Sequence, residues 1–335
     1  MRDSVQASVI IPTRNRAQVL KSCLESLTRQ SVSKEQFEVW VIDNGSTDDT
    51  AAVAQAFADR LTLSCVSAPE PGLHIGRHEG MRRANSDILI YADDDIEAGP
   101  SWVQAVVEAF EDPSVALVGG NNYPLFEEQP PAWLERWWNR SVDRGQALAY
   151  LSVLDFGIGR FEIEPGYVWG CNYSIRRNVL LRAEGFHPDG MPAERLSYRG
   201  DGETHVSEFV RQSGLKAIFD SSASVHHRVA ATRMTSSYFC QRAYAQGVSD
   251  SYTEFRSANG RTSLTARIRW ILDQRLRAAH RLARRVASVG DSVGHELANI
   301  RSDMQKAYRD GYLFHRNSVQ VDPDLRAWVL MENYL

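Results

Sequence analysis

Residues 86–97, SDILIYADDDIE, join an apolar segment to a cluster of three carboxylates. The β-branched run at 88–91 predicts a short buried strand, and Asp93, Asp94 and Asp95 follow it directly. Adjacent carboxylates repel one another, so a folded protein keeps them together only with a compensating cation or full solvation. Because alternate residues of an extended segment point the same way, Asp93 and Asp95 are expected to share one side. Magnesium or manganese, which prefer oxygen ligands, would suit this cluster, and a solvated acidic turn is the alternative.

The composition is typical of a soluble globular protein with a sizeable core. The chain has 335 residues, of which 43% are hydrophobic and 24% are charged. Its formal net charge of −4 argues against general nucleic-acid binding, which usually requires a basic excess. We therefore expect one large domain with extensions and no nucleic-acid partner.

Cysteine spacing and hydropathy indicate a cytoplasmic location. Cys23, Cys65, Cys171 and Cys240 are far apart, which favours reduced thiols over a zinc site or a disulfide framework. The chain enters a strand-like segment almost at once, so we expect no signal peptide. No apolar run reaches the length of about 18 residues that a membrane-spanning helix needs.

Strand-like and helix-like segments alternate over the first hundred or so residues. Apolar runs occur at 8–12, 37–42, 61–66 and 88–91, and helical patterns or glycine-punctuated helix starts lie between them. This alternation predicts a parallel sheet in a doubly wound α/β domain, which binds ligands beyond the carboxyl ends of its strands. The polar ends of the first, second and fourth strands should therefore converge on one crevice, in the position of a nucleotide site.

Several motifs in this order resemble family 2 of the nucleotide-sugar glycosyltransferases. They are SVIIPTRNR (8–16), VIDNGSTDD (41–49), PGLHIGRHEG (71–80), ADDD (92–95), YVWGCNYSIRRNVLLRAEGF (167–186), GDGETHVSEFVRQSG (200–214) and ASVHHRV (223–229). The resemblance covers roughly residues 8–250. It implies the glycosyltransferase-A fold: a doubly wound, mostly parallel sheet flanked by helices, followed here by a helical C-terminal extension. Most members of the family invert the anomeric centre of the transferred sugar.

The resemblance also implies a set of residues that bind the nucleotide sugar. These are Pro12, Thr13, Arg14, Asp43, Arg77, Asp93, Asp94, Trp169, Gly170 and Asn172. In the family, the turn matching 12–14 and the acid matching Asp43 hold the base and ribose, and the arginine matching Arg77 lies beside the base or phosphates. The turn matching 169–172 lies beneath the donor sugar. The family usually has asparagine where this chain has His78.

From the residues alone, three members of this set have plainer interpretations. Asp43 is of the type that makes turns or caps helices, Arg77 could form a surface ion pair, and Trp169 could be a core aromatic.

The metal and catalytic residues follow from the same resemblance. By the family pattern Asp95 binds a divalent metal, manganese or magnesium, that bridges the two phosphates, and Asp94 is a further metal-shell or donor-sugar contact. Of the adjacent His226 and His227, alignment through the following Arg-Val favours His227 as an additional metal ligand. Glu203 falls where the catalytic base usually sits.

The candidate base has a rival and a plainer interpretation. The acid that usually precedes the base is replaced by Gly202, so Asp201, one residue earlier, is the rival base. Both acids could instead be solvated residues at the start of a helix.

The expected domain division is 1–120 for the nucleotide-sugar-binding half, 121–255 for the acceptor-binding half, and 256–335 for the helical extension. Within the acceptor half, the tryptophan cluster at 130–138 could be a sugar platform, a lid or a packing element. Within the extension, 262–289 has the pattern of an arginine-dense amphipathic helix. Such a helix either contacts an anionic membrane surface peripherally or packs on protein, including a second subunit of a homo-oligomer.

These features favour an inverting, metal-dependent glycosyltransferase that uses a nucleotide-diphosphate sugar. A UDP-sugar is preferred over GDP and dTDP, and the acceptor is expected to be a carbohydrate or a lipid-linked molecule. The alternatives are a sugar nucleotidyltransferase and a non-catalytic or membrane-recruited scaffold. The first would need a glycine-rich loop near the first strand, and PTRNRAQV (12–19) contains no glycine.

Overall fold

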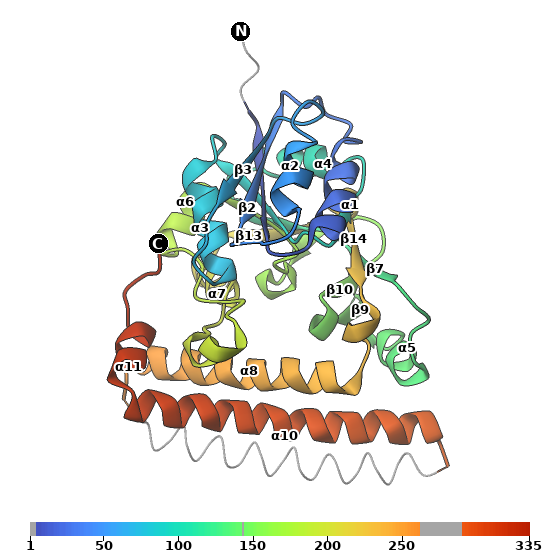
Figure 1. Ribbon diagram of the computed structural model, residues 1–335. Coiled ribbons are helices and arrows are strands. Elements are labelled where there is room, and N and C mark those ends of the chain that lie inside the picture. The colour runs from blue at the N-terminus through green and yellow to red at the C-terminus, as the bar shows by residue number, and fades with distance from the viewer. Residues whose placement is uncertain (1–4, 143, 262–289) are drawn as a thin grey trace.

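The chain forms an α/β domain that packs on a pair of long helices (Figure 1). The computed structural model describes residues 5–142, 144–261 and 290–335. Two sheets form the domain, one of eight strands and one of six. The predicted fold class, an α/β glycosyltransferase-A-like sheet with a helical C-terminal extension, is confirmed.

The eight-stranded sheet is mostly parallel and has the strand order β11-β13-β6-β12-β4-β1-β2-β3. Its strands are β1 (Ala7–Thr13), β2 (Phe37–Asp43), β3 (Leu63–Ser67), β4 (Ile88–Ala92), β6 (Val115–Gly119), β11 (Arg160–Ile163), β12 (Asn172–Arg176) and β13 (Lys216–Asp220). Strands β1 to β4 pair in parallel, as the alternating pattern predicted. Strand β12 enters antiparallel between β4 and β6, so the sheet is mixed at its centre.

Helices cover both faces of this sheet because its strands alternate their apolar residues. Val9 and Ile11 of β1 pack into the cluster on one face, whereas Ile10 packs into the cluster on the other. The first face carries α1 (Ala17–Leu27), α2 (Thr50–Gln55) and α4 (Trp102–Ala109). The second carries α3 (Leu73–Arg83), α6 (Arg177–Arg182) and α7 (Thr204–Gln212). This double covering explains why the strands of the first half read as nearly continuous apolar runs.

The six-stranded sheet brings the segment after the aspartate cluster against the histidine pair. Its order is β5-β14-β7-β10-β9-β8, comprising β5 (Ile96–Ala98), β14 (Val225–Val229), β7 (Asn122–Phe126), β10 (Val153–Asp155), β9 (Gly145–Leu148) and β8 (Ser141–Val142). Strands β5 and β14 are antiparallel, with His227 opposite Ile96. The residue before Ile96 is Asp95, so this register places His227 beside the last aspartate of the cluster.

The tryptophan cluster belongs to the packing between the domain and the helices. It forms α5 (Ala132–Trp138), where Trp133 is 4% exposed. The rings of Trp133 and Trp137 lie 5.1 and 5.4 Å from that of Phe239. Of the interpretations offered by the sequence, these contacts favour the packing element.

The described part of the C-terminal extension consists mainly of two helices. Helix α10 (Ser292–Val321) lies side by side with α8 (Ser236–Ser257), and α11 (Pro323–Val329) follows (Figure 1). The last residues then return to the α/β domain near α3 and α7. The amphipathic segment 262–289 lies outside the described residues. Among the described helices, none is both long and apolar enough to span a bilayer.

Candidate active site

The predicted site residues gather at the carboxyl edge of the eight-stranded sheet. In the parallel register Ile10 of β1 lies opposite Tyr91 of β4, so three residues further along Thr13 reaches the level of Asp94. The Thr13 hydroxyl donates to Asp94 Oδ2 at 2.6 Å. Thr13 is also the register partner of Asp43 on β2. The polar ends of strands one, two and four therefore meet, as the sequence predicted.

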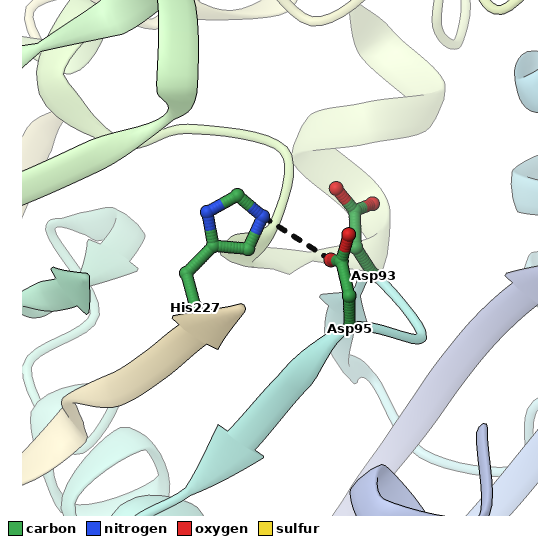
Figure 2. Close-up of side chains that lie close together, drawn as sticks. All are labelled: Asp93, Asp95 and His227. Carbon is green, nitrogen blue, oxygen red and sulfur yellow. Dashed lines mark ion pairs between the residues drawn. The ribbon is translucent and has the colours of Figure 1, made fainter. Parts of the chain in front are cut away.

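Asp93, Asp95 and His227 form a compact group of possible metal ligands (Figure 2). One ligand atom of each lies within 4.8 Å of the others. The His227 and Asp95 side chains are 1% and 5% exposed, and His227 Nε2 lies 3.1 Å from Asp95 Oδ1. Strand alternation separates the two histidines, because His227 is buried toward Asp95 while His226 is exposed.

The atoms in this group fit a divalent cation. Asp95 Oδ1 is buried and accepts no hydrogen bond, although His227 Nε2 is close to it. A divalent cation between Nε2 and Oδ1 would be bound by the lone pairs of both atoms. Carboxylate oxygens with one imidazole nitrogen suit manganese. The site differs from most metal sites in one respect. A metal-bound histidine usually donates its second N–H to a protein group, whereas buried His227 Nδ1 has no partner.

Opposing forces act on the middle and last carboxylates of the cluster. Burial raises the pKa of Asp94 to about 7, although the guanidinium of Arg16 and the Thr13 hydroxyl act in the other direction. Burial acts in the same sense on Asp95, but His227, Arg16 and Arg233 outweigh it and hold the pKa of Asp95 well below its usual value. Asp95, the predicted metal ligand, is therefore the carboxylate of these two that basic side chains stabilise more.

Arg77 links the aspartate cluster to Glu203. Its side chain is 3% exposed, which excludes a surface ion pair, and its guanidinium lies 3.2 Å from Glu203 Oε2 and 3.9 Å from Asp93 Oδ1. Gly170 completes the arrangement: its N–H donates to Glu203 Oε1 at 3.1 Å and its carbonyl accepts from Arg77 at 3.3 Å. A Cβ at position 170 would lie 2.3 Å from Arg77 Nη2, so only glycine permits this approach.

Asp201 faces away from this group. Its side chain is 8% exposed, with Oδ1 2.6 Å from His187 Nδ1 and Oδ2 accepting from the Thr253 hydroxyl of α8 at 2.6 Å. Glu203, two residues later, is 25% exposed and points to Arg77. The two rival acids thus occupy different environments, and only Glu203 contacts the residues around the aspartate cluster.

Two further residues of the predicted donor-binding set, Asp43 and Asn172, lie at the same edge and already make hydrogen bonds within the protein. Asp43 Oδ1 accepts the N–H of Ser46 at 2.7 Å, as a turn residue does. The Asn172 amide is buried and bonded within the protein, because it accepts from Trp102 Nε1 and donates to a backbone carbonyl, both at 2.9 Å.

The other three members of the predicted set differ in exposure. Pro12 is buried within β1, Arg14 is exposed directly after it, and Trp169 is partly buried. The roles of these residues stay predictions.

Two arginines in this site were not predicted from the sequence. Arg16 reaches Asp94 Oδ1 at 2.8 Å and Asp95 Oδ2 at 2.9 Å, and Arg233 lies 3.3 Å from Asp95 Oδ2. A signal was available, since three adjacent acids require compensating charge and Arg16 ends the TRNR motif. Arg233 could not be placed, because nothing local connects it to a residue 138 positions earlier.

A mostly parallel doubly wound sheet, with acids and a histidine at its carboxyl edge, defines a glycosyltransferase-A-like protein. The family model for glycosyl transferase family 2 matches residues 8–180, more than half of the chain. The chain therefore belongs to glycosyl transferase family 2, a family of glycosyltransferases, which confirms the predicted family and enzyme class.

Curated relatives are similar over part of their length. Validoxylamine A glucosyltransferase of Streptomyces hygroscopicus subsp. jinggangensis is 33% identical over 198 residues, covering 54% of this chain and 47% of that protein. A glucosyl-dolichyl phosphate glucuronosyltransferase of Haloferax volcanii is 23% identical over 258 residues, covering 73% of this chain and 76% of that protein. The chain thus spans about half the length of the first of these relatives.

A solved structure shares the fold. The Pyrobaculum calidifontis mannosyltransferase, determined with GDP-Man and Mn2+, matches with a TM-score of 0.53 and 18% identity. The match covers 95% of this chain and 87% of that one. It therefore includes the helical extension as well as the sheet.

Proposed function

We propose that this protein transfers a sugar from a nucleotide-diphosphate sugar to an acceptor hydroxyl, with inversion and with a divalent metal. The observation that carries the proposal is the meeting of two groups at one sheet edge. Asp93, Asp95 and His227 offer metal ligands within 4.8 Å of one another, and Arg77 joins Asp93 to Glu203. This edge is where doubly wound sheets bind nucleotides.

Asp95, Asp93 and His227 would hold the metal, manganese or magnesium. A bound divalent ion acts as a Lewis acid that stabilises the negative charge of the departing nucleoside diphosphate. The protein's own contribution is a buried, pre-oriented set of donors, in which Thr13 and Arg16 fix Asp94 beside Asp95.

Glu203 is the proposed catalytic base. As the acceptor oxygen attacks the anomeric carbon, its proton passes to a Glu203 carboxylate oxygen and the nucleoside diphosphate leaves from the opposite face. Partial exposure makes the carboxylate accessible to an acceptor, while Arg77 and the Gly170 N–H hold its orientation. Asp201 is assigned a positioning role, because its side chain is only 8% exposed and contacts His187 and Thr253 rather than the residues around the aspartate cluster.

The remaining donor contacts are proposed from the predicted set. Pro12, Arg14 and Asp43 border the base and ribose, and Trp169 and Gly170 lie beneath the donor sugar. Asn172 is better suited to shaping the turn than to touching the sugar, because its amide is already bonded within the protein.

The donor and the setting are proposed more broadly. The mannosyltransferase that shares this fold was determined with GDP-Man and Mn2+, which supports a nucleotide sugar and a divalent metal here. A UDP-sugar remains the favoured donor from the family resemblance, with GDP and dTDP as alternatives. The proposed setting is cytoplasmic synthesis of a surface polysaccharide, a glycolipid or a glycosylated metabolite. Peripheral membrane contact through 262–289 and homo-oligomer formation stay predictions.

The direct test is to incubate the protein and Mn2+ with UDP-, GDP- and dTDP-sugars and follow the nucleotide by 31P NMR. Release of a nucleoside diphosphate by hydrolysis or transfer, lost in Glu203→Gln and with chelator, is the expected result. Proton NMR of a transferred sugar should show an inverted anomeric centre. Formation of pyrophosphate from a nucleoside triphosphate and a sugar phosphate would instead identify a nucleotidyltransferase.

A further inference from the structure

Three basic side chains surround the single carboxylate of Asp95. Its Oδ2 accepts from Arg16 at 2.9 Å and from Arg233 at 3.3 Å, while its Oδ1 faces His227. The carboxylate that would bind a divalent cation is thus already paired with two guanidinium groups. A cation entering alone must approach both arginines, which repel it.

The two arginines come from different parts of the chain and are not buried. Arg16 is the residue before α1 and its side chain is 43% exposed. Arg233 ends a short 3₁₀ turn, Ala231–Arg233, and is 21% exposed. Its Nε donates to the Tyr238 hydroxyl at 3.0 Å, and its guanidinium lies 5.5 Å from the centre of that ring. Both side chains are therefore able to exchange partners without exposing the core.

We propose that Arg16 and Arg233 form a latch that holds Asp95 in the absence of donor and binds the donor's diphosphate when the metal arrives. This proposal rests on the function proposed above. Guanidinium groups bind phosphate oxygens as readily as carboxylates, so a diphosphate offers them an equivalent partner while releasing Asp95 to the metal. Metal and nucleotide consequently bind interdependently, each weakly alone.

Arg228 provides a matched control on the same strand. It follows His227, but its guanidinium lies 3.2 Å from Glu97 and 3.8 Å from Glu127. Its side chain thus has the same charge and a similar location without an ion pair to the aspartate cluster, and its backbone N–H, which donates to the Asp95 carbonyl oxygen at 2.9 Å, is retained in any substitution. Replacing it tests whether general loss of positive charge accounts for any effect.

The test measures Mn2+ binding by electron paramagnetic resonance of the free ion, with and without UDP, in Arg16→Met, Arg233→Met and Arg228→Met. If UDP does not bind, the measurement is repeated with GDP and with dTDP. In the wild type, UDP should tighten Mn2+ binding by about 5- to 150-fold, as is usual for coupled sites. Each latch variant should bind Mn2+ alone more tightly and bind UDP with Mn2+ more weakly, so this factor shrinks. Arg228→Met should match the wild type.

Lysine variants guard against loss of folding. Arg16→Lys and Arg233→Lys keep the charge, so Mn2+ alone should bind as in the wild type. Lysine cannot form the bidentate hydrogen bonds of a guanidinium, so UDP should bind more weakly. The latch is overturned if the methionine variants weaken Mn2+ binding in the absence of nucleotide. It is also overturned if they tighten it and leave UDP affinity unchanged. Failure of the wild type to bind any of the three nucleotides with Mn2+ would instead overturn the proposed function.

Discussion

Two buried histidines of this protein, His78 and His227, are equally inaccessible and differ in how their nitrogens are used. Each is 1% exposed. His78 Nε2 accepts the N–H of Phe186 at 2.8 Å and its Nδ1 lies 3.0 Å from the carbonyl oxygen of Tyr334. His227 has one nitrogen without a partner and the other facing an unpaired carboxylate oxygen. A buried polar atom without a partner requires an explanation, and beside Asp93 and Asp95 a bound metal would supply one.

The region around His78 is accordingly a packing element. Tyr334 is 7% exposed, its hydroxyl accepts from that of Tyr252 at 2.9 Å, and its ring lies among those of His74, His187 and Trp328. This cluster joins the C-terminal segment to α3. It gives a physical reason for histidine at position 78, where the family usually has asparagine.

The largest effect is expected from Asp95→Ala. Removing the carboxylate that pairs with His227, Arg16 and Arg233 should abolish metal-dependent nucleotide binding and lower kcat/KM at least about a thousandfold, since a metal contributes several kcal/mol of charge stabilisation. Calorimetry with nucleotide and Mn2+ and a turnover assay would measure both. An active variant with unchanged Mn2+ dependence would place the metal elsewhere.

Glu203→Gln should lower kcat by about 100-fold or more while leaving nucleotide affinity close to that of the wild type. Glutamine keeps the size and an acceptor for the Gly170 N–H but cannot take the acceptor's proton. Asp201→Asn is the comparison: a positioning residue should affect KM and thermal stability as well as kcat. Full activity of Glu203→Gln with loss in Asp201→Asn would reverse the two assignments.

Replacing His78 and replacing His227 should change the free energy of unfolding by different amounts. His78→Ala leaves a cavity and strands the Phe186 N–H, so we expect a loss of about 2–4 kcal/mol in the free energy of unfolding. His227→Ala should cost less stability and should weaken Mn2+ binding in the presence of nucleotide. Urea unfolding of both variants, monitored by circular dichroism, provides the measurement. Equal stability losses would mean that incomplete pairing does not distinguish the site from the fold.

A smaller effect is expected from pH. Burial lowers the pKa of His74 and His315 to about 4 and that of His78 to about 3, from an ordinary value of 6.5. In the unfolded chain these three histidines therefore take up protons as pH falls below 6.5, whereas in the folded chain they do not, and stability decreases. Between pH 7.5 and 6 the three histidines contribute a loss of about 2 kcal/mol. Proton uptake by folded Asp94, whose pKa burial raises to about 7, offsets part of this loss. Urea unfolding of His78→Asn over the same range should show a shallower slope, and an unchanged slope would contradict this assignment.

Local pattern was sufficient for the four parallel strands β1 to β4 and for one end of the site. The apolar runs that became β1, β2 and β4 end in polar residues, and parallel strands bring such ends together whatever the loops do. Glu203 and His227 were placed by resemblance rather than by pattern. The choice of His227 over His226 depends on which face of β14 meets Asp95, and the register with β5 decides that face.

Long-range contacts account for what could not be predicted. The six-stranded sheet is built from short strands far apart in the chain, such as β7 and β14, whose pairing leaves little local signal. Arg233 meets Asp95 across 138 residues, and His78 meets Tyr334 across 256. Neither contact can be predicted from local sequence, because the two residues of each pair are far apart in the chain.

We propose the carboxyl edge of the eight-stranded sheet as a metal-dependent nucleotide-sugar site. The most direct measurement is calorimetric titration of the wild type and Asp95→Ala with UDP, GDP and dTDP, each with Mn2+ and with chelator. We expect the wild type to bind one of these nucleotides only with Mn2+ and the variant to bind none. Absence of binding in the folded wild type, or equal binding with chelator and in the variant, would contradict it.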